Sequence, residues 1–418
     1  MTKRNLFASL LGTVLIGSAA YAQSARPGAP APAKPAAPQA LAAPPLAAGL
    51  YAWQVRPDDI DGYFSSNIPQ PVCGMEQGVW KIFIFTNFDY YPSKNFHNYS
   101  NAVRVGVITT PADTYQLRSS NVSGDAHTLP GARQEFAATS IVKAGETEHT
   151  LYLFGGRNMS GELGDVYSYT PAGGFKFEAN IPVLNGVPGG RSGAVAVPSK
   201  GKIYLFGGRQ GNAVLNQVVA FDPQTKQFAV AASLPTPFYG ARGMTKAVGN
   251  NNYIYLVGGK DVSGGGQNGK VYRYDVLNAH VITVKAANSL PNDLVIPTPG
   301  YPMATWDPSG NVRIIAAGAN GASGVWTWGN IEAWILKDNY GGANDGQATL
   351  IPAPYNNPAR ARDMAGAVKC GNSTYLVGGT YGHGKTFQNR GNLVDRLGGL
   401  TYGPVKTVST QTLNDLRQ

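Results

Sequence analysis

The chain has 418 residues, and only 14% of them are charged, against about 25% in an ordinary globular protein. This composition excludes a highly charged coiled-coil rod and an acidic disordered chain. The 53 glycines and 29 prolines favour many short elements joined by turns, and a length above about 300 residues favours several domains or a repeated unit over one core.

Residues 1–22 have the pattern of a secretory signal peptide. Lys3 and Arg4 precede the apolar stretch 6–17, and Ala20-Tyr21-Ala22 places small residues before a cleavage site at Gln23. No later segment is apolar over the roughly 18 residues that a transmembrane helix needs, and no cysteine follows the cleavage site to carry a lipid. We therefore expect an exported protein in the periplasm or the extracellular space.

Residues 23–49 form a Pro/Ala-rich tract, with 7 Pro and 11 Ala between Ser24 and Gly49. Such a segment buries too little surface to fold, so it is expected to be an extended spacer between the following domain and a surface or partner. A proline-motif docking site is the less favoured alternative. Loss of Lys3 and Arg4 with the signal peptide lowers the formal net charge of +10 by two. The remaining basic residues form no run, so nucleic acid is not expected as a partner.

A short tract recurs along the rest of the chain. Its clear copies are Tyr152-Leu-Phe-Gly-Gly-Arg157, Tyr204-Leu-Phe-Gly-Gly-Arg209, Tyr255-Leu-Val-Gly-Gly-Lys260 and Tyr375-Leu-Val-Gly-Gly-Thr380. The long gap before the last copy has Ile314-Ile-Ala-Ala-Gly318 at its midpoint, and Lys81-Ile-Phe-Ile-Phe-Thr86 is a degenerate first copy. Six units therefore fill residues 50–410 and leave 411–418 as a tail.

Each unit is predicted to contain four short strands. In the third unit these are residues 192–197, 202–206, 214–221 and 227–232, because apolar runs of this length bounded by Gly, Pro and Asn indicate buried strands. The two glycines after the second strand suit a place where strands converge and where the next loop needs a positive φ.

These repeats resemble the kelch family. The double glycine, the loop after it, the Phe221-Asp222-Pro223 signature and an Arg before the first strand are kelch features. The tryptophan usual in the outermost strand is absent, with Phe175 or Phe228 in its place, and the fifth unit lacks both the glycine pair and the Arg. The resemblance implies an all-β fold, a six-bladed kelch-type β-propeller of four-stranded antiparallel blades. Strands from both ends of the chain are expected to share one blade, with residues 50–55 as the N-terminal strand.

Cys73 and Cys370 stand in similar places in the first and last units, just before the second strand. Those units become neighbours only when the propeller closes. In an oxidising compartment a disulfide between them is expected to stabilise the ring; two separate buried thiols are the alternative.

Basic residues recur at two places in the units. Arginines precede the first strands of units two, three, four and six, namely Arg133, Arg191, Arg242 and Arg362, and basic residues follow three of the double glycines, namely Arg157, Arg209 and Lys260. In a propeller both places lie at one rim around the axis, so a shared funnel suited to a carboxylate is predicted. The matching arginines of eukaryotic kelch adaptors form a pocket for acidic peptides. The alternative is that the Arg before the first strand bonds backbone carbonyls between blades.

Three residues near that rim are weak candidates for acid/base catalysis. Glu135 and Asp363 follow Arg133 and Arg362 closely, so an ion pair is the favoured interpretation for both. His383 stands between two glycines in the loop after the last double glycine, where it is a candidate proton carrier or simply a loop residue.

No metal site and no cofactor are predicted. The five histidines are scattered, whereas metal ligation needs a cluster. Kelch-type copper-radical oxidases carry a Tyr-His pair that does not occur here, and the Asp box of sialidases and the GxSxG motif are missing. The Tyr-rich segments 89–94 and 96–100 could stack on sugars or cover the first unit.

The expected function is non-enzymatic. We predict an exported binding or scaffold module whose Arg-rimmed axial funnel takes an acidic glycan or the acidic segment of a partner protein. The alternative is an enzyme similar to the periplasmic kelch sialic-acid mutarotases, with Glu135, Asp363 or His383 as the acid/base group. A structural subunit of a cell-surface assembly is the third possibility.

Overall fold

The fold is described from a computed structural model. The structure describes residues 52–55, 70–76, 78–85, 89–91, 96–98, 103–107, 120–121, 129–131, 133–261, 269–287, 293–294, 303–306, 311–317, 331–352, 366–370, 373–377, 380–383, 386–389 and 394–398. Contacts divide the chain into Met1–Ala43 and Pro44–Gln418, and all described residues belong to the second unit. The predicted signal peptide, the whole Pro/Ala tract and the C-terminal tail lie outside the described residues.

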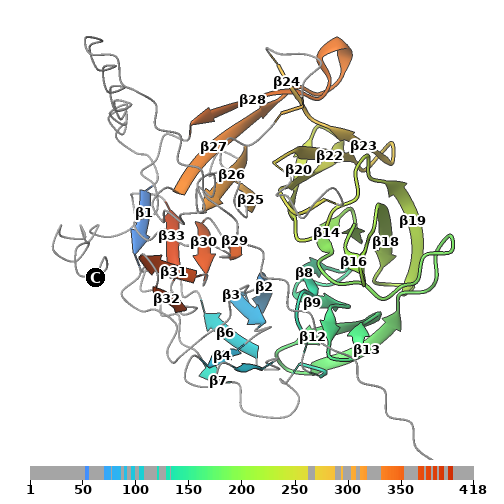
Figure 1. The fold of residues 1–418 in the computed structure, drawn as a ribbon, viewed down its shortest axis with the longest axis vertical. Coiled ribbons are helices and arrows are strands. Elements are labelled where there is room, and N and C mark those ends of the chain that lie inside the picture. Colours follow the sequence, from blue (N-terminus) through green and yellow to red (C-terminus); the bar gives the residue numbers. More distant parts are fainter. Residues whose placement is uncertain are drawn as a thin grey trace, which may run out of the picture. The chain divides into compact units, whose positions relative to one another are not determined.

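The described residues form six sheets of four or five strands (Figure 1). The first three sheets, in pairing order, are β2 (Gln70–Glu76), β3 (Val79–Phe85), β6 (Val103–Val107) and β7 (Ser120–Asn121); β8 (Ala137–Val142), β9 (His149–Phe154), β12 (Asp165–Thr170) and β13 (Gly174–Asn180); and β14 (Val195–Ser199), β15 (Lys202–Phe206), β18 (Gln217–Asp222) and β19 (Gln227–Ser233). The other three are β20 (Arg242–Val248), β21 (Asn251–Val257), β22 (Val271–Asp275) and β23 (His280–Thr283); β25 (Met303–Trp306), β26 (Val312–Ala317), β27 (Ile331–Asp338), β28 (Gln347–Pro352) and β24 (Lys285–Ala286); and β29 (Gly366–Cys370), β30 (Ser373–Val377), β33 (Val394–Gly398) and β1 (Ala52–Val55). Their strands pair antiparallel except for β24 with β28.

Four short hairpins form separate two-stranded sheets. They are β4 (Asp89–Tyr91) with β5 (Phe96–Asn98), β10 (Arg157–Asn158) with β11 (Gly161–Glu162), β16 (Arg209–Gln210) with β17 (Ala213–Val214), and β31 (Thr380–His383) with β32 (Thr386–Asn389). Each hairpin lies between the second and third strands of its unit. Among the described residues, the 3-10 turn η3 (Gly342–Asn344) precedes β28.

The first strands of the sheets contact one another in a closed cycle. β2 contacts β8, and the contacts continue through β14, β20, β25 and β29 back to β2. The later strands of each sheet follow outward from this inner ring (Figure 1). This arrangement is a β-propeller, so the predicted all-β kelch-type propeller is confirmed.

The last sheet joins both ends of the described chain. β1 pairs antiparallel with β33, with Ala52 opposite Gly398 and Val55 opposite Asp395. As expected, a strand within residues 50–55, here Ala52–Val55, completes a sheet whose other strands come from the C-terminal unit.

The predicted disulfide is present. Cys73 on β2 and Cys370 on β29 have their sulfurs 2.06 Å apart and their Cα atoms 5.3 Å apart. Since β2 belongs to the first sheet and β29 to the last, this bond ties the sheets that the cyclic contact brings together.

The apolar repeat is explained by burial on both faces of each sheet. In β15, Ile203 and Leu205 pack against Tyr152 and Phe154 of the preceding sheet. Tyr204 and Phe206 point the other way and pack against the following sheet. Because alternate residues of a strand face opposite sides, a strand between two neighbouring sheets needs apolar residues at every position.

The double glycines lie where neighbouring sheets approach most closely. Gly207 has φ +59°, and a Cβ there would lie 2.2 Å from the carbonyl oxygen of Phe238, which leads into the next sheet. Gly155 has φ +54°, and a Cβ there would lie 2.6 Å from the carbonyl oxygen of Arg191. Both the positive φ and the lack of space exclude a side chain at these positions.

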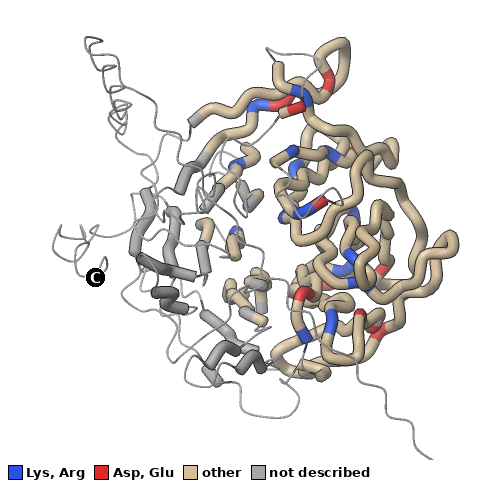
Figure 2. Tube along the Cα trace, in the orientation of Figure 1, with Lys and Arg blue, Asp and Glu red and all other residues tan. Residues whose placement is uncertain are grey.

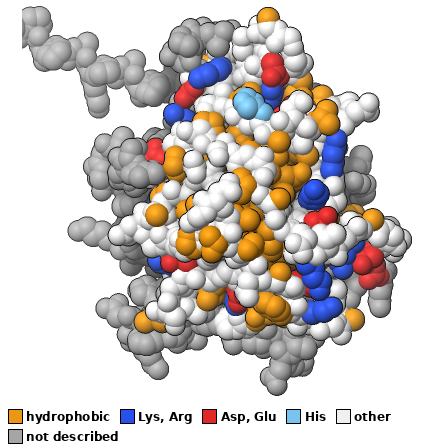
Figure 3. Space-filling model, turned by 90° about the vertical axis from the view of Figure 1, so that its right-hand side faces the viewer, with side chains coloured by type: hydrophobic (Ala, Val, Ile, Leu, Met, Phe, Trp, Pro, Cys, Tyr) orange, Lys and Arg blue, Asp and Glu red, His pale blue; other side chains and the backbone are white. Residues whose placement is uncertain are grey.

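The outer strands carry the expected aromatic substitutes for tryptophan. Phe175 and Phe228 lie on β13 and β19, and their rings are each 4.7 Å from an aromatic ring of the third strand, Tyr169 and Phe221 respectively. The outward side of these sheets shows charges of both signs in small separate groups, with hydrophobic side chains between them (Figure 3). The charge is therefore not concentrated on this perimeter.

Candidate functional site

The first strands enclose a cavity of about 500 Å³. Its lining comes from β2, β8, β14, β20, β25 and β29, together with Trp80 and His149 from the second strands of the first two sheets. Many lining residues are small, among them Ala138, Ala196 and Ala367, and small side chains leave the space open. The volume is within the range of sites for small molecules, about 300–1,000 Å³.

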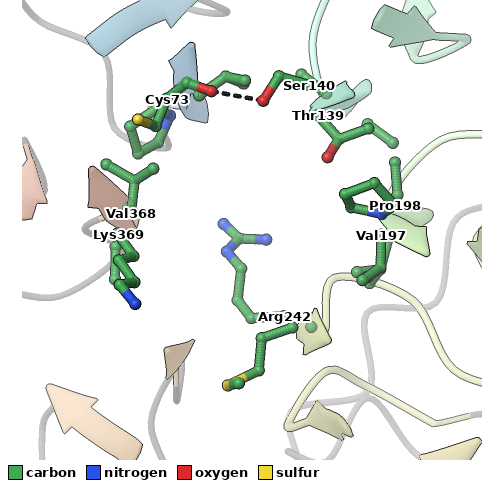
Figure 4. Close-up of a pocket in the computed structure, with 18 of the residues that line it drawn as sticks. Cys73, Thr139, Ser140, Val197, Pro198, Arg242, Val368 and Lys369 are labelled. Atoms are coloured by element: carbon green, nitrogen blue, oxygen red, sulfur yellow. Dashed lines mark hydrogen bonds between the residues drawn. The ribbon is translucent and has the colours of Figure 1, made fainter. Parts of the chain in front are cut away.

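Arg242 extends into this cavity. It is the first residue of β20, and its guanidinium lies within the ring of labelled lining residues in Figure 4. Its Nη1 donates to the carbonyl oxygen of Ala241 at 3.2 Å, and the residue is half-buried.

Lys369 of β29 is a second cationic residue of the lining. Figure 2 shows Lys and Arg on inner strands of the ring. The described lining residues include these two cationic side chains and no carboxylate. The cavity can therefore attract and hold an anion.

Hydrogen bonds between first strands hold the cavity wall. The hydroxyl of Thr245 on β20 donates to the carbonyl oxygen of Pro198 on β14 at 2.6 Å. Ser140 on β8 donates in the same way to the carbonyl oxygen of Cys73 on β2 (Figure 4). Sequence analysis did not single out either hydroxyl. Each stands three residues after the first residue of its own strand, Arg242 or Ala137, which pairs with the last residue of the second strand.

The loops after the double glycines lie at one end of the cavity. Arg157, Arg209 and Lys260 form isolated bridges with Gln134, Ser192 and Tyr239 respectively. These partners come two or three residues before the lining residues Ala137, Ala194 and Ala241. The three basic residues therefore occupy equivalent positions at this end, which we call the double-glycine end.

Glu135 lies between two of those basic residues. Its Oε2 accepts from Nη2 of Arg209 at 2.7 Å and lies 3.6 Å from Nε of Arg157. The guanidinium of Arg209 also stacks over Tyr239, with 5.0 Å between Cζ and the ring centroid. The structure thus brings together three candidate residues of the sequence analysis in one ion-pair cluster. Glu135 is in an ion pair as expected, but its partners are Arg157 and Arg209 instead of its sequence neighbour Arg133, which pairs with Asp165.

Arg133 is part of the wall between sheets and does not reach the cavity. Its side chain is 2% exposed and makes two hydrogen bonds with the carboxylate of Asp165, at 2.7 and 3.0 Å. Further donors reach the carbonyl oxygens of Pro130 and Gly155. This geometry is the structural alternative considered for the arginine before the first strand.

Arg191 occupies the same position in the next unit and is also buried. Its Nε donates to the carbonyl oxygen of Gly189 at 3.2 Å, and Nη2 to Oε1 of Gln217 at 3.5 Å. Burial lowers the pKa of its guanidinium to about 10. Arg191, like Arg133, is absent from the described cavity lining.

Arg242 does not occupy the position of Arg133 and Arg191, which corrects the expectation of one recurring position. Arg242 pairs with Val257 at the end of the second strand, as Val195 pairs with Phe206. The equivalent of Arg191 is therefore Phe238, four residues earlier. The carbonyl oxygen of Phe238 accepts from the N–H of Gly208 at 2.9 Å. In the same way, the carbonyl oxygen of Arg191 accepts from the N–H of Gly156 at 2.9 Å. This difference in register is what places Arg242 in the cavity.

Three other candidates are not described at the side-chain level. Arg362 and Asp363 lie outside the described residues. His383 is the last residue of β31, and its side chain lies outside the described part.

Comparison with known proteins agrees with the architecture. The KLHDC2/KLHL20/DRC7 Kelch-repeats domain family matches residues 97–293. The chain contains a kelch-repeat domain. The solved structure "Structure of YjhT" is similar over 79% of this chain and 94% of that chain, with a TM-score of 0.50 and 17% identity, which is a likeness of fold. No curated protein matches the chain.

Trp80 and His149 line the cavity at the end opposite the double-glycine end. The sequence analysis did not identify this pair. Their ring centroids are 5.5 Å apart, and Nδ1 of His149 accepts from the backbone N–H of Met75 at 3.1 Å. Burial lowers the pKa of His149 because desolvation disfavours the imidazolium. Each residue stands five places before the end of its second strand, so aligning the repeats on that strand would have found the pair.

Among the residues that the structure describes, no group of three or more His, Cys, Asp or Glu side chains could hold a metal ion. No helix among the described residues has the length and apolar character of a membrane span.

Proposed function

We propose that the kelch domain is a binding module that takes an acidic ligand into its axial cavity, with Arg242 as the main anion contact. The observation that carries the proposal is the position of the Arg242 guanidinium within a cavity of about 500 Å³ whose described lining holds no carboxylate. A guanidinium is always charged, and its planar fork of donors matches a carboxylate.

The cavity favours an acidic glycan as the ligand. A volume of about 500 Å³ suits one or a few sugar units and is too small for a folded domain. Trp80 offers an aromatic surface on which the apolar face of a sugar can pack. The acidic segment of a partner protein is the other form of ligand that the same charge would attract.

Arg157, Arg209 and Lys260 complete the proposed binding surface at the double-glycine end. Their positive charge would steer an anion toward the cavity. Arg133 and Arg191 belong to the structural framework of the sheets, so we do not include them among the ligand contacts. Arg362 stays a prediction from the sequence.

Titration calorimetry with glucuronate, and with glucose as the neutral counterpart, tests the proposal. We expect glucuronate to bind more tightly than glucose, and Arg242→Ala to weaken glucuronate at least about tenfold, the loss typical of one hydrogen bond to a charged group. Lys176→Ala is the matched control because it removes one positive charge from the outer strand β13, where the residue is exposed. Equal glucuronate affinity in the Arg242→Ala variant and the native protein would refute the proposal.

A sugar-acid mutarotase is the alternative, and Glu135 at the cavity end is the residue that favours it. NMR measurement of anomer exchange separates the two functions: a rate equal to that in buffer removes the enzyme. A structural subunit of a surface assembly is the third function, and it would show as self-association of the purified protein.

We also propose that the protein is exported. The Cys73–Cys370 disulfide supports an oxidising compartment such as the periplasm or the extracellular space. A shorter mature chain beginning at Gln23, read by mass spectrometry of the exported protein, is the expected result.

A further inference from the structure

Glu135 has an unusual backbone conformation for its place in the fold. Its φ is +53°, and the equivalent residues of the next two units are glycines, Gly193 at +65° and Gly240 at +72°. The equivalence follows from two backbone hydrogen bonds, from Gly193 N–H to the carbonyl of Glu135 at 2.6 Å and from Gly240 N–H to the carbonyl of Gly193 at 2.7 Å. Glycine therefore suits this position better than glutamate.

The other non-glycine residues with positive φ have ordinary explanations. Lys200, Lys226 and Ala279 lie in tight turns between paired strands, and Asn185 lies in a short turn between β13 and β14. Glu135 instead lies at a bend just before β8, outside the tight turns that join paired strands. A strained residue outside a turn is a reason to look for a function of its side chain.

The side chain of Glu135 occupies a site built for a carboxylate by residues of several units. Arg157 comes from the same unit as Glu135, and Arg209 comes from the next unit. Tyr239, which stacks with Arg209, lies just before β20, the first strand of the following unit. The carboxamide of Gln134, with its oxygen turned toward Arg157, accepts from Nε and Nη2 of Arg157 at 2.8 and 2.9 Å. Both guanidinium groups are thus held in place by neighbours other than Glu135.

Glu135 uses only part of what Arg209 offers. Oε2 accepts from Nη2 of Arg209, whereas Nε of Arg209 is buried and has no hydrogen-bond partner. A carboxylate that approaches in the plane of the guanidinium can accept from both atoms at once. A ligand carboxylate can therefore form a more complete interaction with Arg209 than Glu135 does.

We propose that Arg157 and Arg209 form a carboxylate subsite of the ligand-binding surface, which Glu135 fills when no ligand is bound. An acidic ligand replaces the Glu135 carboxylate and takes both donors of Arg209. This inference rests on the proposed function. The replacement is feasible because the Glu135 and Arg209 side chains are 25% and 21% exposed, and ion pairs open to water are weak.

Glu135→Gln tests the competition, with glucuronate as the probe in titration calorimetry. Removal of the competing charge is expected to tighten glucuronate binding three- to tenfold. Arg209→Ala introduced into the Glu135→Gln protein should abolish this gain. Glu146→Gln is the matched control, because it removes a charge of the same sign from the exposed turn after β8 and should leave the affinity unchanged.

The outcomes separate this inference from the function on which it rests. If the native protein binds glucuronate and Glu135→Gln binds it equally or more weakly, Glu135 only positions Arg209 and the subsite proposal is wrong, while the binding function stands. If neither protein binds glucuronate, both proposals fail. Glu135→Gly is the second variant: it suits the positive φ, should fold as stably as the native protein, and should show the same tighter binding.

Discussion

Arg133 and Arg191 occupy the same position in successive units but differ in their partners. Arg133 makes two hydrogen bonds with the Asp165 carboxylate at the start of β12. Arg191 has no carboxylate partner: its Nη2 donates to Oε1 of Gln217 at the start of β18 at 3.5 Å, its Nε donates to the carbonyl oxygen of Gly189, and its Nη1 is buried without a hydrogen-bond partner. A buried guanidinium without a carboxylate is costly to fold around, so Arg191 is the less stabilised of the two.

Changing residue 217 to an acid should repair this position. Gln217→Glu supplies a carboxylate to Arg191 but loses the hydrogen bond that Nε2 of Gln217 donates to the carbonyl oxygen of Leu184 at 2.8 Å. The free energy of unfolding is expected to rise by about 1 kcal/mol at neutral pH, the value of a charge-assisted hydrogen bond less that of the neutral one. The converse change, Asp165→Asn, should lower it by about 2 kcal/mol or more, because Arg133 would lose its paired charge. Urea denaturation of both variants measures whether the free energy of unfolding rises in the first and falls in the second. A Gln217→Glu protein less stable than the native one would contradict the expectation.

The strands show how far the sequence alone predicts the elements. In the third unit the second strand is found as predicted, and the fourth is longer by one residue. The first strand starts at Val195 rather than at residue 192, because Ser192 bridges to Arg209 and Gly193 has a positive φ of +65°. Local apolar patterns predict strands well, whereas strand ends depend on contacts with the next loop.

Register is what the sequence could not supply. Arg191 and Arg242 stand at the same distance before their glycine pairs, which made them look equivalent. However, β20 and β21 have seven residues each, whereas β14 and β15 have five. Each arm of the later hairpin is two residues longer, so Arg242 lies four positions further along the ladder than Arg191. The position of Arg242 in the cavity depends on this difference.

The glycine pairs should be intolerant of any side chain, for two separable reasons. Gly207→Ala adds both a strained positive φ and a Cβ 2.2 Å from the Phe238 carbonyl oxygen, so we expect a loss of about 3 kcal/mol or more, as for severe overpacking. Gly201→Ala is the control: its φ is +76° with nothing within 4 Å of the new Cβ, and only the conformational cost of about 1–2 kcal/mol applies. Thermal denaturation of the two variants compares these losses, and equal losses would show that the close approach has no cost.

At the scale of the whole molecule, the disulfide joins residues 297 positions apart. A bond that closes so long a loop restricts the unfolded chain more than the folded one. The sequence predicted this bond from the ring, because the first and last units are neighbours only in a closed propeller. What the sequence could not predict is the size of the axial cavity, since it depends on how closely all the first strands approach.

Removal of the disulfide should destabilise the propeller without changing its fold. Cys73→Ser with Cys370→Ser is expected to lower the free energy of unfolding by about 2–5 kcal/mol. Chemical denaturation of the variant, and of the native protein with and without reductant, measures this loss. Reductant should not affect the double variant, and a variant as stable as the oxidised native protein would contradict the prediction.

The pairing of β1 with β33 bears on how such a protein can change in evolution. In an open solenoid, repeats can be added one at a time because a new repeat simply stacks on the last. Here the N-terminal strand completes the C-terminal sheet, so an inserted unit would have to widen the whole circle and tilt every sheet relative to its neighbours. The number of units is therefore fixed collectively, and variation between related proteins is expected in the loops rather than in the repeat count.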